Sequence, residues 1–313
     1  MILFGPIPSR RLGRSLGINN IPPKCCSYSC VYCQIGRTNS MRKMRSHFYD
    51  PEQIFNETAL RITELKKSNE KVDYLSFVPD GEPTLDINLG KTIEKLKVIG
   101  IKIAVITNAS LIWDEQVRND LMNADWVSLK IDSTDKEIWR KIDRPHGSLS
   151  LLKILDGIRQ FSRQFEGTLV TETMLVKGLN DSMNVLEQTA DFIGDIQPST
   201  AYILVPTRPP AEKNVLPPDE ITLNIAYQIF IKTIKHVELL TNNEGTDFTF
   251  TNDAEKELMS ILAVHPMSKD ALKEFLDKSK TDWGLIERLI DTHRIRQVEY
   301  ASNIYLIRNL MIP

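Results

Sequence analysis

Short apolar runs and amphipathic segments alternate along the chain from residue 12 to residue 236. The apolar runs predict strands at 12–20, 72–78, 101–106, 126–131, 169–176 and 201–205. The segments that follow predict helices at 51–67, 89–99, 114–121, 150–163, 182–194 and 218–236, with Gly100 at the position of a helix C-cap. This alternation predicts the α/β class, with a parallel sheet, right-handed crossovers and an active site at the carboxyl ends of the strands.

Residues 252–313 form a separate predicted unit behind a polar stretch at 241–251, which we expect to be a linker. Helices are predicted at 253–264, 269–278 and 282–292, and a hairpin at 294–308, an order typical of a winged helix. The unit holds nine Lys and Arg against ten Asp and Glu, and its third helix carries three acids and one arginine. Because phosphate binding needs the reverse charge, we expect a module that contacts a protein or peptide, or a lid, rather than a DNA-binding domain.

Composition excludes several classes of protein. Hydrophobic residues make up 42% and charged residues 26% of the chain, which argues against wholesale disorder. No apolar run approaches the roughly 18–20 residues of a membrane helix, and the first residues lack the pattern of a secretory signal. We therefore expect a cytoplasmic protein of two units, residues 1–240 and 252–313.

All four cysteines lie within nine residues, at Cys25, Cys26, Cys30 and Cys33, and residues 34–313 contain none. A disulfide framework would spread its cysteines to close loops, whereas thiols on one short loop suit a metal or a cluster. Cys26, Cys30 and Cys33 offer three thiolates, which would leave one iron of a four-iron cubane open, because such a cluster takes four ligands. The alternative is zinc, with Cys25 as a fourth ligand; adjacent residues of an extended chain point to opposite faces, which argues against Cys25.

Residues 1–49 carry eight basic side chains and no acidic one. The basic residues are Arg10, Arg11, Arg14, Lys24, Arg37, Arg42, Lys43 and Arg45. The whole chain has a net charge of −2, so the remainder carries −10, since −2 minus +8 is −10. The basic stretch predicts either a solvated arm or a rim that attracts anions to the chemistry of the cysteine loop.

The stretch Cys26-Ser-Tyr-Ser-Cys30-Val-Tyr32-Cys33 resembles the signature of the radical S-adenosylmethionine (radical SAM) enzymes, including the aromatic residue before the last cysteine. The resemblance implies a [4Fe-4S] cluster on the three cysteines, whose open iron binds the amino and carboxylate groups of S-adenosylmethionine. It also implies a one-electron donor such as ferredoxin or flavodoxin, and release of a 5′-deoxyadenosyl radical. The fold implied over about residues 1–240 is a partial (β/α)6 barrel.

Polar residues at the predicted strand ends extend the resemblance. The stretch Pro79-Asp80-Gly81-Glu82-Pro83 stands where the family has a Gly-Gly-Glu segment near the methionine amino group, with Asp80 in place of the first glycine. The resemblance assigns the cosubstrate to Tyr32, Gly81, Glu82, Pro83, Asn108, Ser128, Lys130 and Asp132. The last three share one face of their strand, so the alternative is an internal Lys–Asp pair with a structural role. In the next strand Glu172 shares a face with Met174, and the sequence does not say whether that face points inward.

Four arginines are candidates for substrate binding. Arg208 lies after the sixth predicted strand in a loop with three prolines, and Arg10, Arg11 and Arg14 enter the first strand. Because arginine pairs with phosphate in bidentate geometry, we expect an anionic substrate: RNA, a peptide or a phosphorylated metabolite. In the competing interpretation, the N-terminal arginines pair with acids such as Asp80 or Glu82 and only hold the N-terminus in place.

Residues 9–17 and the cysteine loop look most like a subgroup related to the wybutosine-synthesis enzymes, which modify a guanosine in transfer RNA. Those enzymes use a second cluster with its own cysteines, and here every thiol lies at 25–33, so a single cubane is expected. The resemblance implies an enzyme that cleaves S-adenosylmethionine reductively and abstracts hydrogen from an unidentified substrate. The alternative is a non-catalytic iron–sulfur or zinc protein with a regulatory winged helix.

Overall fold

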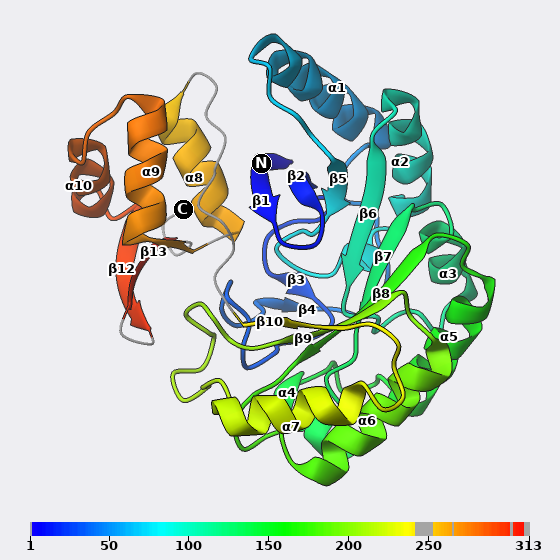
Figure 1. Cartoon of the computed structure of the whole chain (residues 1–313). Coiled ribbons are helices and arrows are strands. Elements are labelled where there is room, and N and C mark those ends of the chain that lie inside the picture. The colour runs from blue at the N-terminus through cyan, green and yellow to red at the C-terminus, as the bar shows by residue number, and fades with distance from the viewer. Residues whose placement is uncertain (1, 242–252, 265, 301–302, 310–313) are drawn as a thin grey trace.

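The core of the molecule is an eight-stranded sheet, and the computed structural model describes residues 2–241, 253–264, 266–300 and 303–309. In sheet order the strands are β1 (Leu3–Ser9), β2 (Gly13–Ile18), β5 (Tyr74–Phe77), β6 (Lys102–Thr107), β7 (Trp126–Lys130), β8 (Thr168–Met174), β9 (Thr200–Leu204) and β10 (Val237–Leu240). β1 and β2 pair antiparallel, and the pairs from β2 to β10 are parallel. The sheet curves into an open barrel with β1 and β10 at its edges (Figure 1).

Helices cover the outer, convex side of this sheet (Figure 1). They are α1 (Pro51–Lys67), α2 (Leu89–Leu96), α3 (Glu115–Leu121), α4 (Lys136–Ile142), α5 (Leu151–Gln164), α6 (Met183–Ile196) and α7 (Glu220–Phe230). The longer ones turn an apolar stripe towards the strands; in α5 the stripe includes Ile154, Ile158 and Phe161, all buried. The short α4 packs instead on the cysteine loop, where Trp139 donates to the hydroxyl of Tyr28 at 3.0 Å. The predicted α/β class and the partial barrel are therefore confirmed, and the carboxyl ends of β2 and β5 to β9 meet at one end of it.

The structure departs from the predicted elements in three respects. β1 is absent from the prediction because Pro6 and Pro8 argue against a strand, and the structure places it at the sheet edge, where proline is tolerated. The short helix α4 is also absent from the prediction, although Asp135 caps it by accepting from the backbone of Glu137 and Ile138. The helix expected at 218–236 ends at Phe230, and the short strand β10 follows.

A second unit follows the barrel and has its own core. Its elements are α8 (Ala254–Val264), β11 (Met267–Ser268), α9 (Lys269–Ser279), α10 (Gly284–Asp291), β12 (Ile295–Tyr300) and β13 (Asn303–Arg308), with the sheet order β11-β13-β12. Leu258, Leu272, Phe275 and Ile286 are fully buried in that core. The three helices and the hairpin match the expected order, whereas membership of the winged-helix class stays a prediction. Most of the expected linker at 241–251 lies outside the described residues.

Side chains of the second unit form hydrogen bonds with the barrel at two places. α8 lies beside β1 (Figure 1), and Glu257 accepts a hydrogen bond of 2.8 Å from Arg61 of α1. On the other side, the hydroxyl of Tyr300 donates to the carbonyl of Pro206 at 3.1 Å, and the hydroxyl of Tyr305 donates to the carbonyl of Thr207 at 2.9 Å. Both tyrosines thus hold the backbone of the loop that follows β9.

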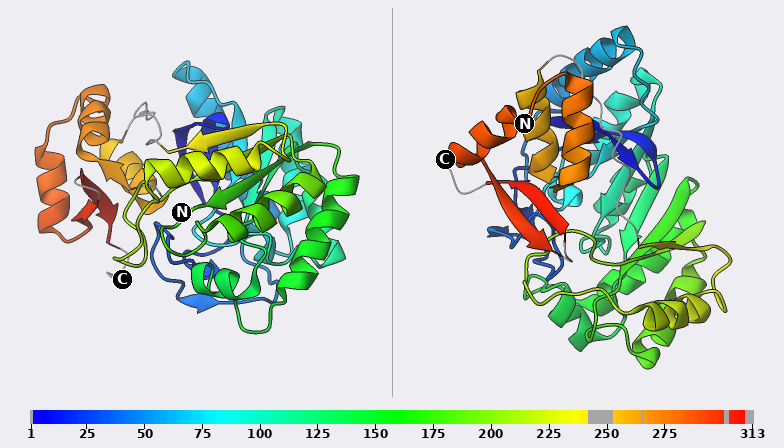
Figure 2. Two further views of the ribbon diagram at one scale, coloured as in Figure 1. Left: turned by 60° about the horizontal axis from the view of Figure 1, so that its bottom comes forward. Right: turned by 60° about the vertical axis from the view of Figure 1, so that its left-hand side comes forward.

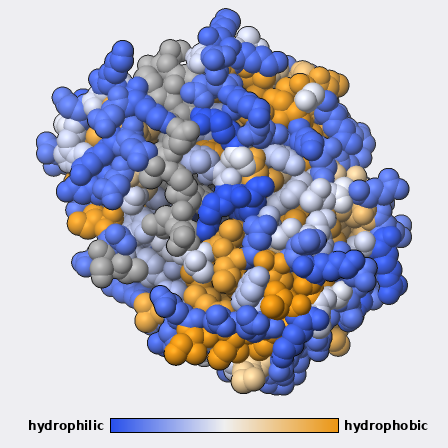
Figure 3. Space-filling view, viewed as in Figure 1, coloured by the Kyte–Doolittle hydropathy of each residue, from blue (hydrophilic) through white to orange (hydrophobic). Residues whose placement is uncertain are grey.

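The surface is mixed in character. Exposed apolar side chains gather over α6 and α7, in the lower orange area of Figure 3, and include Met183, Ile221 and Ile225. In the part of the chain that the structure describes, no helix combines the length and the apolar character needed to cross a membrane.

Candidate functional site

Three of the four thiols line one small cavity at the carboxyl end of the barrel. β3 (Cys25–Cys26) pairs with β4 (Ser40–Met41), and this ribbon supports the loop that carries Cys30 and Cys33. Cys26, Cys30 and Cys33 line a cavity of about 170 Å³, whereas Cys25 is buried and does not line it. Burial raises the pKa of all three cavity thiols. The structure therefore groups the cysteines as the alternation argument expects.

Strand ends form the rest of this cavity and bring predicted residues together. Gly81, Glu82, Asn108 and Lys130 are among its lining residues, together with Tyr32. Gly81 touches the cysteine loop so closely that a Cβ there would lie 1.9 Å from the carbonyl oxygen of Cys25. Any other residue would push the two segments apart, which gives this glycine a structural reason beyond turn formation.

Glu82 holds the ends of β5 and β6 in register. Its carboxylate accepts hydrogen bonds from the hydroxyls of Thr84 and Thr107, both at 2.6 Å, and from the backbone N–H of Asn108 at 2.8 Å. Burial raises its pKa even though these bonds oppose the rise. Because protein donors already occupy the carboxylate, the structure supports a positioning role for Glu82.

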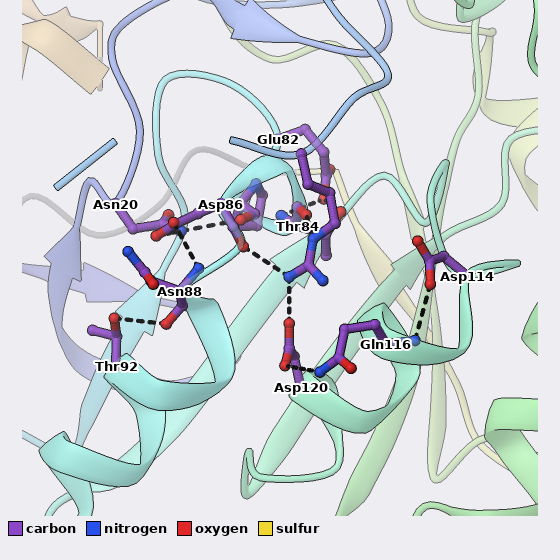
Figure 4. Close-up of polar contacts among 11 residues, drawn as sticks. Asn20, Glu82, Thr84, Asp86, Asn88, Thr92, Asp114, Gln116 and Asp120 are labelled. Carbon is purple, nitrogen blue, oxygen red and sulfur yellow. Dashed lines mark hydrogen bonds and ion pairs between the residues drawn. The ribbon is translucent and has the colours of Figure 1, made fainter. Parts of the chain in front are cut away.

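A second polar network, centred on Arg45, stabilises the loop that follows Glu82. The guanidinium of Arg45 forms an ion pair with Asp120 and donates to the carbonyls of Thr84 at 3.0 Å and Asp86 at 2.8 Å (Figure 4). Asn20 reaches the same loop, because its amide donates to the carbonyl of Pro83 at 3.0 Å. Pro83 itself starts a short turn and lines neither the thiol cavity nor the larger cavity described below.

Tyr32 connects the cysteine loop to the end of β7. Its hydroxyl donates to Asp132 and, at 3.1 Å, to Asp143, and the thiol of Cys30 lies 3.3 Å from Asp143. Burial first, and then neighbouring Asp132, raise the pKa of Asp143 well above its usual range. Asp143 is a residue that sequence reasoning missed; the only signal is its place before the helix-breaking Arg144-Pro145 pair.

The inward face of β7 and β8 is polar. Lys130 lies over the ring of Tyr32, 4.8 Å from its centroid, and Asp132 and Glu172 raise its pKa although burial alone would lower it. Ser128 donates to Glu172 at 2.6 Å. Glu172 also forms an ion pair with Arg11, and Arg11 and Lys130 bring its pKa below the usual range despite burial. Glu172 therefore faces the barrel interior, which settles the question that the strand alternation left open.

A larger cavity of about 300 Å³ adjoins the thiol cavity inside the barrel. Its walls include Arg10, Arg11, Arg208 and Lys130, with Tyr32, Cys33 and Asp80 shared between the two cavities. Arg14 does not line either cavity: its guanidinium pairs with Glu70 at 2.7 Å. Arg11 and Arg14 do pair with acids, as the competing interpretation expects, but with Glu172 and Glu70 rather than with Asp80 or Glu82. Glu172 reaches Arg11 across the barrel from β8.

Asp80 is the buried acid at the boundary of the two cavities. Among the described residues its side-chain oxygen Oδ1 has no hydrogen-bond partner, and burial raises its pKa to about 7. Arg308 of β13 and Lys24 oppose that rise without pairing with it. The residue that replaces the expected glycine is therefore a buried carboxyl group that releases its proton at a higher pH than an ordinary aspartate.

Two residues of the loop after β9 contact the cysteine loop. Arg208 donates to the side-chain oxygen of Gln34 at 2.8 Å. Glu212 accepts from Arg37 at 2.9 Å, pairs with Arg144, and its backbone N–H donates to the carbonyl of Val31. The loop after β9 thus lies between the cysteine loop and the tyrosines of the second unit.

The donor set bears on which group the thiols could hold. In the described residues, no three His, Cys, Asp or Glu side chains are placed to hold a single metal ion. A cubane differs, because each thiolate binds a separate iron, and three thiols facing one cavity suit that arrangement. The amide of Asn108, whose nitrogen lies 3.5 Å from the sulfur of Cys26, adds a donor of the kind that tunes such sulfurs. The residues present therefore fit an iron–sulfur cluster.

Comparison with known proteins agrees with this site. The chain matches the family model of the Radical SAM superfamily over residues 20–193. A UPF0026 protein of Methanocaldococcus jannaschii is 45% identical over 311 residues, which cover 99% of this chain and 96% of that protein. An S-adenosylmethionine-dependent nucleotide dehydratase of Flammeovirga pacifica is 22% identical over 245 residues, which cover 74% of this chain and 79% of that protein.

A solved structure supports the barrel fold. A radical SAM methyltransferase from Sphaerobacter thermophilus aligns with a TM-score of 0.52 at 12% identity, covering 73% of this chain and 67% of that chain. At this level of identity the likeness concerns the fold alone.

Proposed function

The chain belongs to the radical SAM superfamily, and from that premise we propose that it is an enzyme with a single [4Fe-4S] cluster on Cys26, Cys30 and Cys33. When bound, the cluster and S-adenosylmethionine supply a 5′-deoxyadenosyl radical through one-electron reductive cleavage, and the radical abstracts hydrogen from the substrate. The single observation that carries the proposal is the grouping of three thiols, without Cys25, around one cavity at the carboxyl end of the barrel.

The chain's own residues prepare the site for these groups. Glu82 fixes two strand ends, Asn108 offers an amide to the Cys26 sulfur, and Lys130 brings a positive charge to the wall shared by both cavities. Lys130 is the candidate to meet an anionic group such as a carboxylate, because its charge is maintained by Asp132 and Glu172. Ser128 and Asp132 act indirectly. Ser128 donates a hydrogen bond to Glu172, and Asp132 accepts one from the hydroxyl of Tyr32.

The substrate in this proposal is an anion that enters the larger cavity. Arg10 and Arg208 line that cavity, and this position supports a role in binding the anion. Arg14 is no longer a candidate, because it does not line the cavity and pairs with Glu70. Equilibrium titration with inorganic pyrophosphate as a probe should detect binding that weakens as salt rises, and Arg208→Gln should weaken it further. Binding that is insensitive to salt and to this substitution would count against an anionic substrate.

The decisive experiment is anaerobic reconstitution with iron and sulfide, followed by dithionite and S-adenosylmethionine. We expect a brown protein with about four irons per chain, and release of 5′-deoxyadenosine measured by chromatography. The alternative, a non-catalytic iron–sulfur or zinc protein, predicts either bound zinc without colour or a full cluster that releases no 5′-deoxyadenosine.

A further inference from the structure

The cysteine loop has an outer surface that differs from its inner one. We define the outer face as Lys24, Met41, Arg42, Lys43 and Met44. Met44 is 71% and Met41 38% exposed. In the described chain, neither Lys24, Arg42 nor Lys43 takes part in an ion pair, and the side chain of Arg42 donates only to Ser40. The outer face therefore presents uncompensated positive charge around two exposed methionines.

Three acids that lie close to the cysteine loop do not pair with these cations. Asp80 is buried, and its backbone carbonyl accepts a hydrogen bond of 2.6 Å from the N–H of Lys24. Glu82 is enclosed by its own donors, and Glu212 is engaged by Arg37 and Arg144. No acid occurs in residues 1–49, so the chain supplies none from the segment itself.

The outer face is joined to the thiol cavity through Lys24 and through the backbone. Lys24 lines that cavity together with Gly36 and Thr38. The backbone N–H of Arg42 donates to the carbonyl of Cys26 at 2.9 Å, and in the ladder Met41 pairs with Cys26. One hydrogen bond and a few covalent bonds thus connect the outer face to a cluster cysteine.

Other approaches to the thiols are less direct. The barrel strands and the larger cavity cover the inner side. In both views of Figure 2 the short blue ribbon of β3 and β4 lies at the periphery of the barrel. The outer face therefore offers an electron from another protein a route to the thiol cavity that passes through a single hydrogen bond to Cys26.

We propose that the outer face is the docking surface for a small acidic one-electron donor protein. The inference rests on the proposed function, which requires such a donor. In each encounter the donor loses one electron and the cluster gains it; no bond is made or broken between the proteins, and no proton needs to cross. Charge complementarity speeds such transient encounters, and flexible methionines adapt to a partner's surface.

RNA is the competing occupant of a basic surface. Apart from His47, residues 34–47 contain no aromatic side chain, and Phe48 and Tyr49 pack against the core of the barrel, whereas proteins that bind single-stranded RNA stack bases on aromatic side chains. Three unpaired cations also make a small footprint, which suits an electron-transfer contact better than a tract of phosphates. The charge and the composition of the outer face therefore favour a protein partner.

The test compares two electron sources on the reconstituted full-length chain. Arg42→Glu and Lys43→Glu, alone and together, are compared with the matched double variant Lys153→Glu and Arg163→Glu on α5. Reduction of the cluster is followed by its visible absorbance, with reduced flavodoxin or with dithionite as donor, at low and high salt. Binding of oxidised flavodoxin is measured separately by calorimetry.

We expect the outer-face variants to slow reduction by flavodoxin about tenfold or more at low salt, to remove its salt dependence and to weaken binding. Reduction by dithionite should match the wild type, and the α5 variant should behave as wild type throughout. Lys43→Gln repeats the measurement with charge removed rather than reversed, in case charge reversal prevents cluster assembly.

Equal rates with flavodoxin in all variants, or equal losses in the outer-face and α5 variants, would overturn the proposal. So would loss of affinity for a single-stranded RNA oligonucleotide in the outer-face variants without loss of flavodoxin binding. Failure of the proposed function gives a different result, because the wild type would then either hold no reducible cluster or be reduced without releasing 5′-deoxyadenosine.

Discussion

The strands that begin the chain and the outer face of the cysteine loop carry the same charge and use it differently. In β2 and the turn before it, Arg11 and Arg14 pair with Glu172 and Glu70. On the outer face, Arg42 and Lys43 have no acidic partner in the described residues. The comparison teaches that a basic run in a sequence is not one feature: the fold neutralises some of its charges and leaves others for a partner.

The largest expected effect concerns the thiols that lie between these two regions. Cys26→Ala, Cys30→Ala and Cys33→Ala should each abolish the brown chromophore or reduce release of 5′-deoxyadenosine to background, because in the proposed cubane each thiolate would hold a separate iron. Cys25→Ala should keep both, since Cys25 does not line the cavity. Iron content, visible spectra and product release test this; a full cubane with normal turnover in Cys30→Ala contradicts it.

Arg45 allows an internal cation to be compared with a surface cation of the same segment. It lies three residues from Arg42, but its side chain is buried in an ion pair with Asp120. Arg45→Met should destabilise the protein by about 3–5 kcal/mol, because it leaves Asp120 buried without its cation. Arg42→Met should change the free energy of unfolding by no more than about 0.5 kcal/mol.

Urea denaturation of both variants provides the measurement. Equal stabilities for the Arg45 and Arg42 variants would break the distinction between an internal and a surface cation.

Asp80 extends the comparison to a buried acid that no cation of the described residues pairs with. Its pKa rises from 3.8 to about 7, so the unfolded chain ionises first as pH increases, and stability falls between pH 4 and pH 7. Asp80→Asn removes this loss and should stabilise the cluster-free protein at pH 8 by on the order of 4 kcal/mol. At pH 4 the variant and the wild type should be similar.

Thermal unfolding of the cluster-free protein at pH 4 and pH 8 tests the Asp80 prediction. A stability difference that does not depend on pH would show that Asp80 is ionised in the folded state and neutralised by groups such as Lys24 and Arg308.

The smallest effect is expected where the paired cations are exposed. Glu212 has its pKa lowered to about 2 by hydrogen bonds from Arg37 and Arg144, so its stabilising contribution is present above pH 4.5 and is lost as pH falls towards 2. Because Arg37 is 70% exposed, Glu212→Gln should cost less than about 1 kcal/mol at pH 7. A loss as large as that of Arg45→Met would mean that the loop after β9 governs stability.

Much of the fold could be predicted from hydrophobic periodicity alone. The runs that became β5 to β9 are buried on both faces and therefore read as apolar segments between amphipathic helices. β1 could not be predicted, because its two prolines argue against a strand. The strand forms because it pairs with β2 at the edge of the sheet, where proline is tolerated.

The site divides in the same way. The cysteine spacing and the residues Gly81, Glu82 and Asn108 are local signals, and the structure brings them to one cavity. Asp143 could not be predicted as a site residue, because its contact with Cys30 joins residues 113 positions apart in the sequence. The ion pair between Arg11 and Glu172 likewise depends on which strands meet across the barrel.

The hydroxyls of Tyr300 and Tyr305 have a consequence for the order of assembly. A nascent chain carries all four cysteines and the strands β1 to β10 by residue 240. The loop after β9, which holds Arg208 beside the larger cavity, acquires these hydroxyl donors only when the hairpin β12–β13 has been synthesised. The thiols are thus synthesised long before the loop beside the larger cavity gains these two hydrogen bonds, so the hairpin β12–β13 completes a loop made some ninety residues earlier.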